Sequence, residues 1–287
     1  MLKYNQMKYV ILFSYLINTA FLYAQDNEKD YVVTFTKSSL KPMAQVEDGT
    51  GVERKELFEE FARKMNPLTP ELKMSMTLGH YWTGVSTDVL AINAYESIAD
   101  ADKVNEDGQK TRERAWRRDD VREEFFKNYD KYWVGGHTDM EIFRMIPDRT
   151  KTRKRKPKEN TVITITTHYV APLSEVEGGS AEERSEIFDK FFEDVEMKND
   201  KLLSQIVLGH YWSGELGYGK GWPIVYVREW ASMADADDNE SWGKVQEEAW
   251  PDEAEREAKV KRYFEYMSGN PVSYTHLRAH ETLRYLV

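Results

Sequence analysis

The chain has no cysteine among its 287 residues. Disulfides, a thiolate nucleophile and thiolate metal ligands are therefore excluded, and the fold must be held together by an apolar core. The composition can supply such a core, since 40% of the residues are apolar and 13% are aromatic, which is ordinary to rich for a globular protein. The length suits one large domain or two small ones.

Several signatures of enzymes and of binding sites are also missing from the sequence. It contains no phosphate-cradling glycine loop, no nucleophile elbow and no dinucleotide fingerprint. Outside residues 272–287, no two histidines have the spacing of a zinc motif. We therefore expect no metal site and no cofactor. The formal net charge of -10 argues against a general affinity for nucleic acid.

Long apolar runs are absent except near the N-terminus. Lys3 and Lys8 precede an apolar run at 9–21, and Ala24 lies just before a polar segment. This pattern predicts a signal peptide at 1–24 and a periplasmic or secreted protein. The run is too short to cross a bilayer, which takes about 20 residues, so we expect no membrane partner after cleavage.

The most informative feature of the chain is an internal repeat. Residues 31–84 align without a gap to residues 161–214, and 19 of the 54 paired positions are identical. The longest shared run, Leu-Gly-His-Tyr-Trp, occupies 78–82 and 208–212. A duplication of this length predicts two structurally similar units.

Each copy opens with a strand and a helix. Residues 31–37 and 161–167 are rich in valine, isoleucine and threonine in near alternation, which predicts first strands. Thr50 and Ser180 precede segments whose apolar residues recur every three or four positions. These segments are predicted to be helices with a hydroxyl N-cap.

The second half of each copy contains a hairpin and a charged helical region. The Leu-Gly-His-Tyr-Trp run predicts a second strand, and residues 88–95 and 223–230 predict third strands. Ser97 and Ser232, each followed by aspartates, are typical helix starts.

A fourth strand is predicted only in the first copy, at 137–146. The resulting order β-α-β-β-α-β is a ferredoxin-like unit. We therefore expect a first repeat at 31–147, a basic linker at 148–160 and a truncated second repeat at 161–268. Since the linker is strongly basic, it is most simply a solvated connection; a polyanion contact and a protease-sensitive site stay open as alternatives.

Residues 272–287 have no counterpart in the first copy and resemble translated sequencing-adapter read-through. We interpret them as a non-native tail, so the second repeat is expected to lack its last strand. The second strand of the first repeat would then have a free edge, which could lead to self-association.

The order of elements, with the phrase Ser-x-Ala-Asp-Ala after each third strand, resembles the dimeric α/β-barrel superfamily. The resemblance covers about residues 30–268. It implies an α+β fold in which two ferredoxin-like repeats form an α/β barrel, here as a fused pseudo-dimer. The superfamily includes cofactor-free monooxygenases and haem-degrading enzymes. Haem-degrading members use Asn, Trp and His, but Asn93, Trp82 and His80 do not match that pattern, so we transfer no roles.

Strand alternation places His80 with Trp82 on one face of its strand, and His210 with Trp212 on the matching face. That face lies either inside the barrel or under the helices. If it lies inside, both histidines approach one apolar cavity. A site that also used the third strands would be asymmetric, because Asn93 in the first copy is replaced by Arg228 in the second. The candidate ligand-binding residues are His80, Trp82, His210, Trp212, Asn93 and Arg228.

Three functions stay open at this point. The first is binding of a small, largely apolar ligand in the cavity between the repeats. The second is a cofactor-free or haem-dependent monooxygenase with a histidine base. The third is a non-catalytic structural or interaction module, in which the repeated aromatic strand serves only packing. Whether the protein is an enzyme is left undecided by the sequence.

Overall fold

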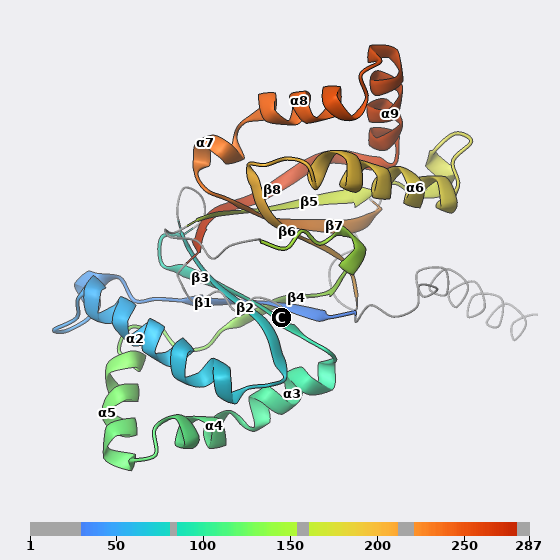
Figure 1. Ribbon diagram of the computed structural model, residues 1–287. Helices are drawn as coiled ribbons and strands as arrows, with labels where there is room; N and C mark the ends of the chain where they lie inside the picture. Colours follow the sequence, from blue (N-terminus) through green and yellow to red (C-terminus); the bar gives the residue numbers. More distant parts are fainter. Residues whose placement is uncertain (1–29, 81–84, 154–160, 212–220, 280–287) are drawn as a thin grey trace, which may run out of the picture.

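The computed structural model describes residues 30–80, 85–153, 161–211 and 221–279, the last eleven of them by their backbone. The predicted signal peptide lies outside this range. Figure 1 shows strands at the centre, with the helices of the first repeat on one side and those of the second repeat on the other. The predicted α+β fold, a barrel built from two ferredoxin-like repeats, is confirmed.

The described strands form one closed barrel in the order β1-β3-β2-β8-β5-β7-β6-β4, and every neighbouring pair is antiparallel. Their bounds are β1 (Val32–Ser39), β2 (Leu72–His80), β3 (Asp88–Tyr95), β4 (Thr138–Met145), β5 (Val162–Val170), β6 (Leu202–His210), β7 (Trp222–Trp230) and β8 (Met267–Ala279). The second strands begin earlier than predicted, at Leu72 and Leu202.

Each repeat supplies its own helical layer. The described α-helices are α2 (Gly51–Met65), α3 (Ile98–Glu106), α4 (Gly108–Ala115) and α5 (Asp119–Asp130) in the first repeat, and α6 (Ala181–Phe191), α7 (Met233–Ala236), α8 (Asn239–Ala249) and α9 (Glu253–Glu265) in the second. Short helices are η1 (Met43–Gln45), η2 (Asn66–Leu68), η3 (Pro147–Arg149), η4 (Leu173–Glu175) and the π-helix η5 (Phe192–Glu196). No helix in the described ranges has the length and apolar character needed to span a membrane.

The prediction that the second repeat lacks its last strand is wrong. Strand β8 pairs with β5 within the repeat and with β2 across the seam, so the predicted free edge of β2 is covered. The physical reason is visible in residues 272–275, Val-Ser-Tyr-Thr, which alternate apolar and polar side chains as a strand does.

Two seams join the repeats into the barrel. Leu78 of β2 pairs with Ala279 of β8, and Phe143 of β4 pairs with His210 of β6. The Leu-Gly-His-Tyr-Trp strands therefore lie along the seams, as predicted. Because both repeats contribute to one sheet, neither can lose its strands without opening the barrel.

Side-chain caps and a buried tyrosine fix the first helix of each repeat. The predicted N-caps Thr50 and Ser180 each accept a hydrogen bond from the amide three residues on, which confirms them. Tyr132 and Tyr266, both 0% exposed, accept a hydrogen bond from the amide of the N-cap residue. Their hydroxyls donate to a glutamate in the first turn of that helix. The same arrangement, in which a buried tyrosine hydroxyl joins the N-cap amide to a first-turn glutamate, thus occurs twice, and we call it the tyrosine lock.

The barrel interior is a single apolar core shared by both repeats. It contains Val33, Phe35, Met74, Met76, Leu78, Ile92, Ala94, Phe143, Met145, Ile163, Ile165, Ile206, Leu208, Val225 and Val227. These residues alternate along each strand, which identifies the face of the sheet that lies inside.

Candidate functional site

The histidines of the repeated motif lie on the interior face of the barrel. His210 pairs directly with Phe143, and cross-strand partners share a face. Leu208, two residues before His210, is a fully buried member of the interior core, and Leu78 has the same position relative to His80. The alternative in which the histidines lie under the helices does not hold for this structure.

Both histidines also lie at the same end of the barrel. Strands β2 and β6 are four steps apart in a sheet whose neighbours are all antiparallel, so they run in the same direction. Each of them ends at its histidine. We call this end the histidine end. Trp82 and Trp212 lie outside the described residues, so the predicted aromatic partners of the histidines are not placed.

His210 has an aromatic neighbour. The imidazole of His210 lies 5.3 Å from the indole of Trp222, ring centroid to ring centroid, in an edge contact. Partial burial lowers the pKa of His210 below its usual value. The neutral ring is therefore favoured there, and it could act as an acceptor or a base at neutral pH.

Asn93 and Arg228 are separated from the histidines by the sheet itself. Each alternates with interior residues of its strand and so lies on the face that the helices cover. Arg228 pairs with Glu196 at 2.6 Å and donates to the side chain of Gln205 at 2.6 Å. The candidate residues Asn93 and Arg228 therefore do not share a face of the sheet with His80 and His210.

A cavity of about 90 Å³ lies between the repeats at the opposite end of the barrel. It is lined by Met74, Met76, Thr150, Lys151, Thr152, Arg153, Ile163, Ser204, Ile206, Val227 and Glu229. Ser204 comes near the start of β6 and Glu229 near the end of β7, far along the strands from the histidines. We call this end the cavity end.

A buried carboxylate marks the polar side of this cavity. Glu229 is 2% exposed. It accepts hydrogen bonds from Arg153 at 2.8 Å, from Thr161 at 2.6 Å and from Ser204 at 2.7 Å. Both carboxylate oxygens are therefore occupied, which is the condition under which a buried charge is tolerated.

The arginine of this pair comes from the predicted linker. Lys151 exchanges two backbone hydrogen bonds with Gln205, both at 2.9 Å, and its ammonium donates to the carbonyl of Asn199 at 2.8 Å. Arg149 pairs with Asp189 at 2.7 Å. The described part of the linker is thus docked on the second repeat, and its interpretation as a solvated connection is wrong for residues 149–153.

The interior does not fit a haem between its two ends. The core there is closely packed, with Leu78 and Leu208 fully buried and the rings of Phe35 and Phe143 5.0 Å apart. A macrocycle would have to displace these side chains. Within the part of the chain that the structure describes, no three His, Asp or Glu side chains are grouped as a metal site requires.

Sequence reasoning missed the cavity end. Met74 and Met76 do alternate with polar residues, and Glu229 stands in a run of valines, isoleucines and aromatics. A charged residue in such a strand is a usable signal, because buried charges need partners. The partner, Arg153, could not be identified, since it is one of seven basic residues among ten.

Comparison with known proteins identifies no family. No protein-family model matches the chain, and no curated protein matches it. Among solved structures it is similar to a candidate monooxygenase from Lactobacillus acidophilus NCFM (11% identity, 90% of this chain, 98% of the other, TM-score 0.49). It is also similar to an anthrone oxidase-like protein, with 15% identity over 88% of this chain and 92% of the other and a TM-score of 0.42. A third similar structure is chlorite dismutase from Candidatus Nitrospira defluvii, with 8% identity over 86% of this chain and 90% of the other and a TM-score of 0.44.

Similarities with TM-scores below 0.5 carry no argument about chemistry. The α+β barrel described above, however, has the architecture that the resemblance to the dimeric α/β-barrel superfamily implies.

Proposed function

We propose that the protein binds a small, largely apolar molecule in the cavity between its repeats, at the cavity end. The observation that carries this proposal is the composition of the cavity wall. Met74 and Met76 come from the first repeat, and Ile163, Ile206 and Val227 come from the second. Such a mostly apolar wall with a few polar groups is typical of ligand sites.

The size and polarity of the cavity limit the occupant. A volume of about 90 Å³ is smaller than the roughly 150 Å³ of an apolar protein cavity that binds benzene. The ligand is therefore a molecule of a few non-hydrogen atoms, unless the flexible methionines move to make room. Because Glu229 already has its hydrogen-bond partners, a strongly polar ligand gains little there.

The proposal is tested by titrating the protein with cyclopentane while following the methionine methyl groups by NMR. We expect saturable shifts of the Met74 and Met76 signals, and their loss in Val227→Phe, whose ring fills the cavity. Val52→Phe is the matched control, since Val52 is 69% exposed. Absence of shifts in the wild type, or equal shifts in Val227→Phe, would contradict the proposal.

A cofactor-free monooxygenase is the second candidate function. The observation that favours it is the common end and common face of His80 and His210, because a desolvated histidine can serve as a base. The test is oxygen consumption with a hydroquinone, comparing the wild type with His80→Ala plus His210→Ala. Equal rates would remove this candidate, and failure of both tests would leave the interaction module.

A further inference from the structure

One wall of the cavity at the cavity end does not belong to the barrel. Seven of the described residues that line it come from strands β2, β5, β6 and β7, and the other four are the successive residues 150–153. We call residues 150–153 the strap. The strands of a closed barrel are hydrogen-bonded on both sides, so they cannot separate without opening the sheet. The strap is therefore the wall that can move at the lowest cost.

The strap is attached to β6 at a single described position. Lys151 and Gln205 exchange two backbone hydrogen bonds, both at 2.9 Å, in an isolated antiparallel bridge. Strand β7, by comparison, pairs with β6 along most of the length of both strands. Local opening costs less free energy where fewer contacts are broken. The strap can therefore leave β6 while the barrel stays closed.

A buried ion pair attaches the strap to a second strand. The guanidinium of Arg153 lies 2.8 Å from the carboxylate of Glu229 on β7, and the two side chains are 7% and 2% exposed. Glu229 alternates with the interior residues Val225 and Val227, so its carboxylate faces the inside of the barrel. The strap is thus held across the end of the barrel by one bridge and one ion pair.

The strap separates the cavity from solvent by a single layer of residues. Thr152 lines the cavity and is at the same time exposed. Displacement of the strap therefore connects the cavity directly with solvent.

We propose that the strap controls the access of small molecules to the cavity. A molecule enters or leaves when the bridge at Lys151 and the ion pair of Arg153 break together. The strap then sets the rates of binding and release, as mobile lids do in other proteins. This inference rests on the proposed function for its use, but the opening of the strap can be measured without a bound ligand.

The experiment is oxidation of methionine by hydrogen peroxide, followed by peptide mass spectrometry. Peroxide must enter the cavity to reach Met74 and Met76, which line it. Met140 is 47% exposed and reports free access, whereas Met145 is 1% exposed in the interior core and reports unfolding. We expect Met74 and Met76 to react more slowly than Met140 but about tenfold faster than Met145, because local opening costs less than unfolding.

A disulfide between the strap and β6 tests whether the strap is the part that moves. Because the bridge is antiparallel, Thr152 stands opposite Ser204, and Cα atoms of such pairs are about 4.5 Å apart, which a disulfide can span. Thr152→Cys with Ser204→Cys should slow the oxidation of Met74 and Met76 to the rate of Met145. The chain has no other cysteine, so titration of free thiols shows whether the bond has formed. Thr152→Ser, which leaves two hydroxyls in place of the disulfide, is the matched control.

Removal of the ion pair should have the opposite effect. Arg153→Ala with Glu229→Gln leaves no buried charge without a partner, and we expect Met74 and Met76 to be oxidised about tenfold faster than in the wild type. The matched control is Lys103→Ala with Glu71→Gln, which removes an ion pair of 2.6 Å between α3 and the residue before β2 and should leave the rates unchanged.

Three results would overturn the proposal. They are oxidation of Met74 and Met76 no faster than that of Met145 in the wild type, equal rates in the disulfide variant and in Thr152→Ser, and equal rates with and without the Arg153 ion pair.

Addition of cyclopentane separates this inference from the proposed function. A molecule bound in the cavity should protect Met74 and Met76 from peroxide. If cyclopentane gave no protection while the disulfide still slowed oxidation, the proposed function would fail and the role of the strap would stand. If cyclopentane protected both methionines while the disulfide had no effect, the role of the strap would fail and the proposed function would stand.

Discussion

The helix-facing sides of the two half-barrels use matched positions for different chemistry. Asn66, Ser75, Ala91 and Asn93 in the first repeat correspond to Glu196, Gln205, Tyr226 and Arg228 in the second. In the first repeat the strand residues of this set are partly exposed. In the second, Glu196, Gln205 and Tyr226 are at most 4% exposed. One scaffold therefore supports both a small polar surface and a buried charged network.

The second repeat closes its network with several partners around one guanidinium. Arg228 bonds to Glu196 and Gln205, and it lies 4.5 Å from the ring centre of Tyr226 and 5.3 Å from that of Trp242. Helix α6 and the π-helix η5 bury several side chains, whereas α2 buries none. The two repeats therefore keep the same strands, while the side chains between the strands and the helices have diverged.

The largest effect is expected from giving the second repeat one residue of the first. Arg228→Asn leaves the carboxylate of Glu196 buried without its cation, and we expect a loss of about 3 kcal/mol in the free energy of unfolding. Urea denaturation followed by fluorescence measures this loss.

A double substitution is the matched control. Glu196→Asn with Arg228→Asn removes both charges and restores the pair of residues found in the first repeat, so it should be less destabilising than Arg228→Asn alone. If the double variant were the less stable of the two, the network would not depend on charge compensation.

The second prediction concerns a feature that the repeats share. A Cβ at Gly49 would lie 2.5 Å from the Val46 side chain, and one at Gly179 would lie 2.8 Å from the Tyr266 hydroxyl. Because these neighbours are buried, either glycine-to-alanine change should destabilise by about 1–3 kcal/mol. Gly51→Ala, where nothing lies within 4 Å, is the control. A large difference between Gly49→Ala and Gly179→Ala would show that the two tyrosine locks are not equivalent.

The third prediction is a pH dependence confined to the second repeat. Burial, and then the charge of Arg228, lowers the pKa of His168 to about 4; Ser38 is its counterpart in the first repeat. The unfolded histidine binds a proton first as the pH falls, so His168 lowers stability progressively from about pH 6.5 to about pH 4.

Removal of this histidine should flatten the pH profile. Between pH 7 and pH 5, His168→Gln should lose about 2 kcal/mol less unfolding free energy than the wild type, as measured by urea denaturation at each pH. Ser38→His places a histidine at the matched position of the first repeat, where Asn93 takes the place of Arg228. Identical profiles for the wild type and His168→Gln would contradict the prediction.

Local patterns in the sequence were sufficient for the strands, the helix starts and the duplication. Alternation and hydroxyl caps depend on residues within a few positions of each other, as at Thr50 and Ser180, and such signals can be read directly. The missing strand was an error of a different kind. Residues 272–275 alternate as a strand does, but the resemblance of the whole segment to read-through predicts a tail instead.

The candidate sites were harder because their geometry is not local. Alternation places His80 and His210 on equivalent faces, but it cannot say which face lies inside, since both faces of a covered sheet are buried. The ion pair of Arg153 and Glu229 joins residues 76 positions apart. Only closure of the barrel brings them together, and no short-range pattern reports that closure.

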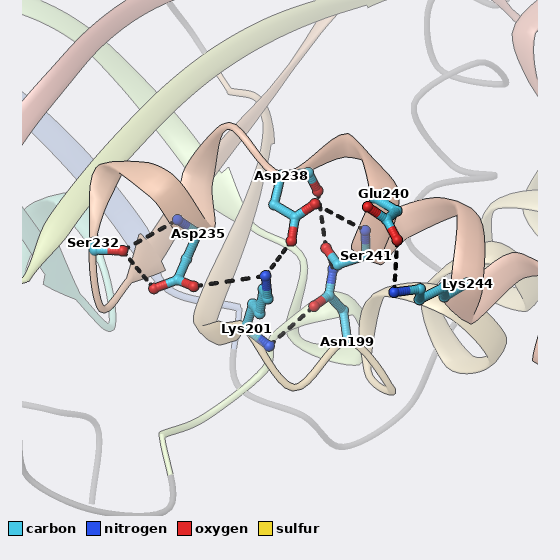
Figure 2. Close-up of polar contacts among 8 residues, drawn as sticks. All are labelled: Asn199, Lys201, Ser232, Asp235, Asp238, Glu240, Ser241 and Lys244. Atoms are coloured by element: carbon cyan, nitrogen blue, oxygen red, sulfur yellow. Dashed lines mark hydrogen bonds and ion pairs between the residues drawn. The ribbon is translucent and has the colours of Figure 1, made fainter.

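The smallest expected effect concerns an ion pair whose charges are reversed between the repeats. In the first repeat, Glu71 before β2 pairs with Lys103 of α3 at 2.6 Å. At the matched positions of the second repeat, Lys201 before β6 pairs with Asp238. Figure 2 shows Lys201 reaching both Asp235 and Asp238. Both repeats thus have an ion pair at these positions, but the acidic and the basic residue have changed places.

Reversal of the second pair should therefore be tolerated, whereas reversal of one member should not. Lys201→Glu brings a third carboxylate next to Asp235 and Asp238, and we expect a small decrease in the melting temperature that disappears at high salt. Lys201→Glu combined with Asp238→Lys recreates the arrangement of Glu71 and Lys103 and should recover most of the decrease. If the double variant melted no higher than Lys201→Glu, the reversed pairs would be incidental surface contacts that do not hold the helix to the strand.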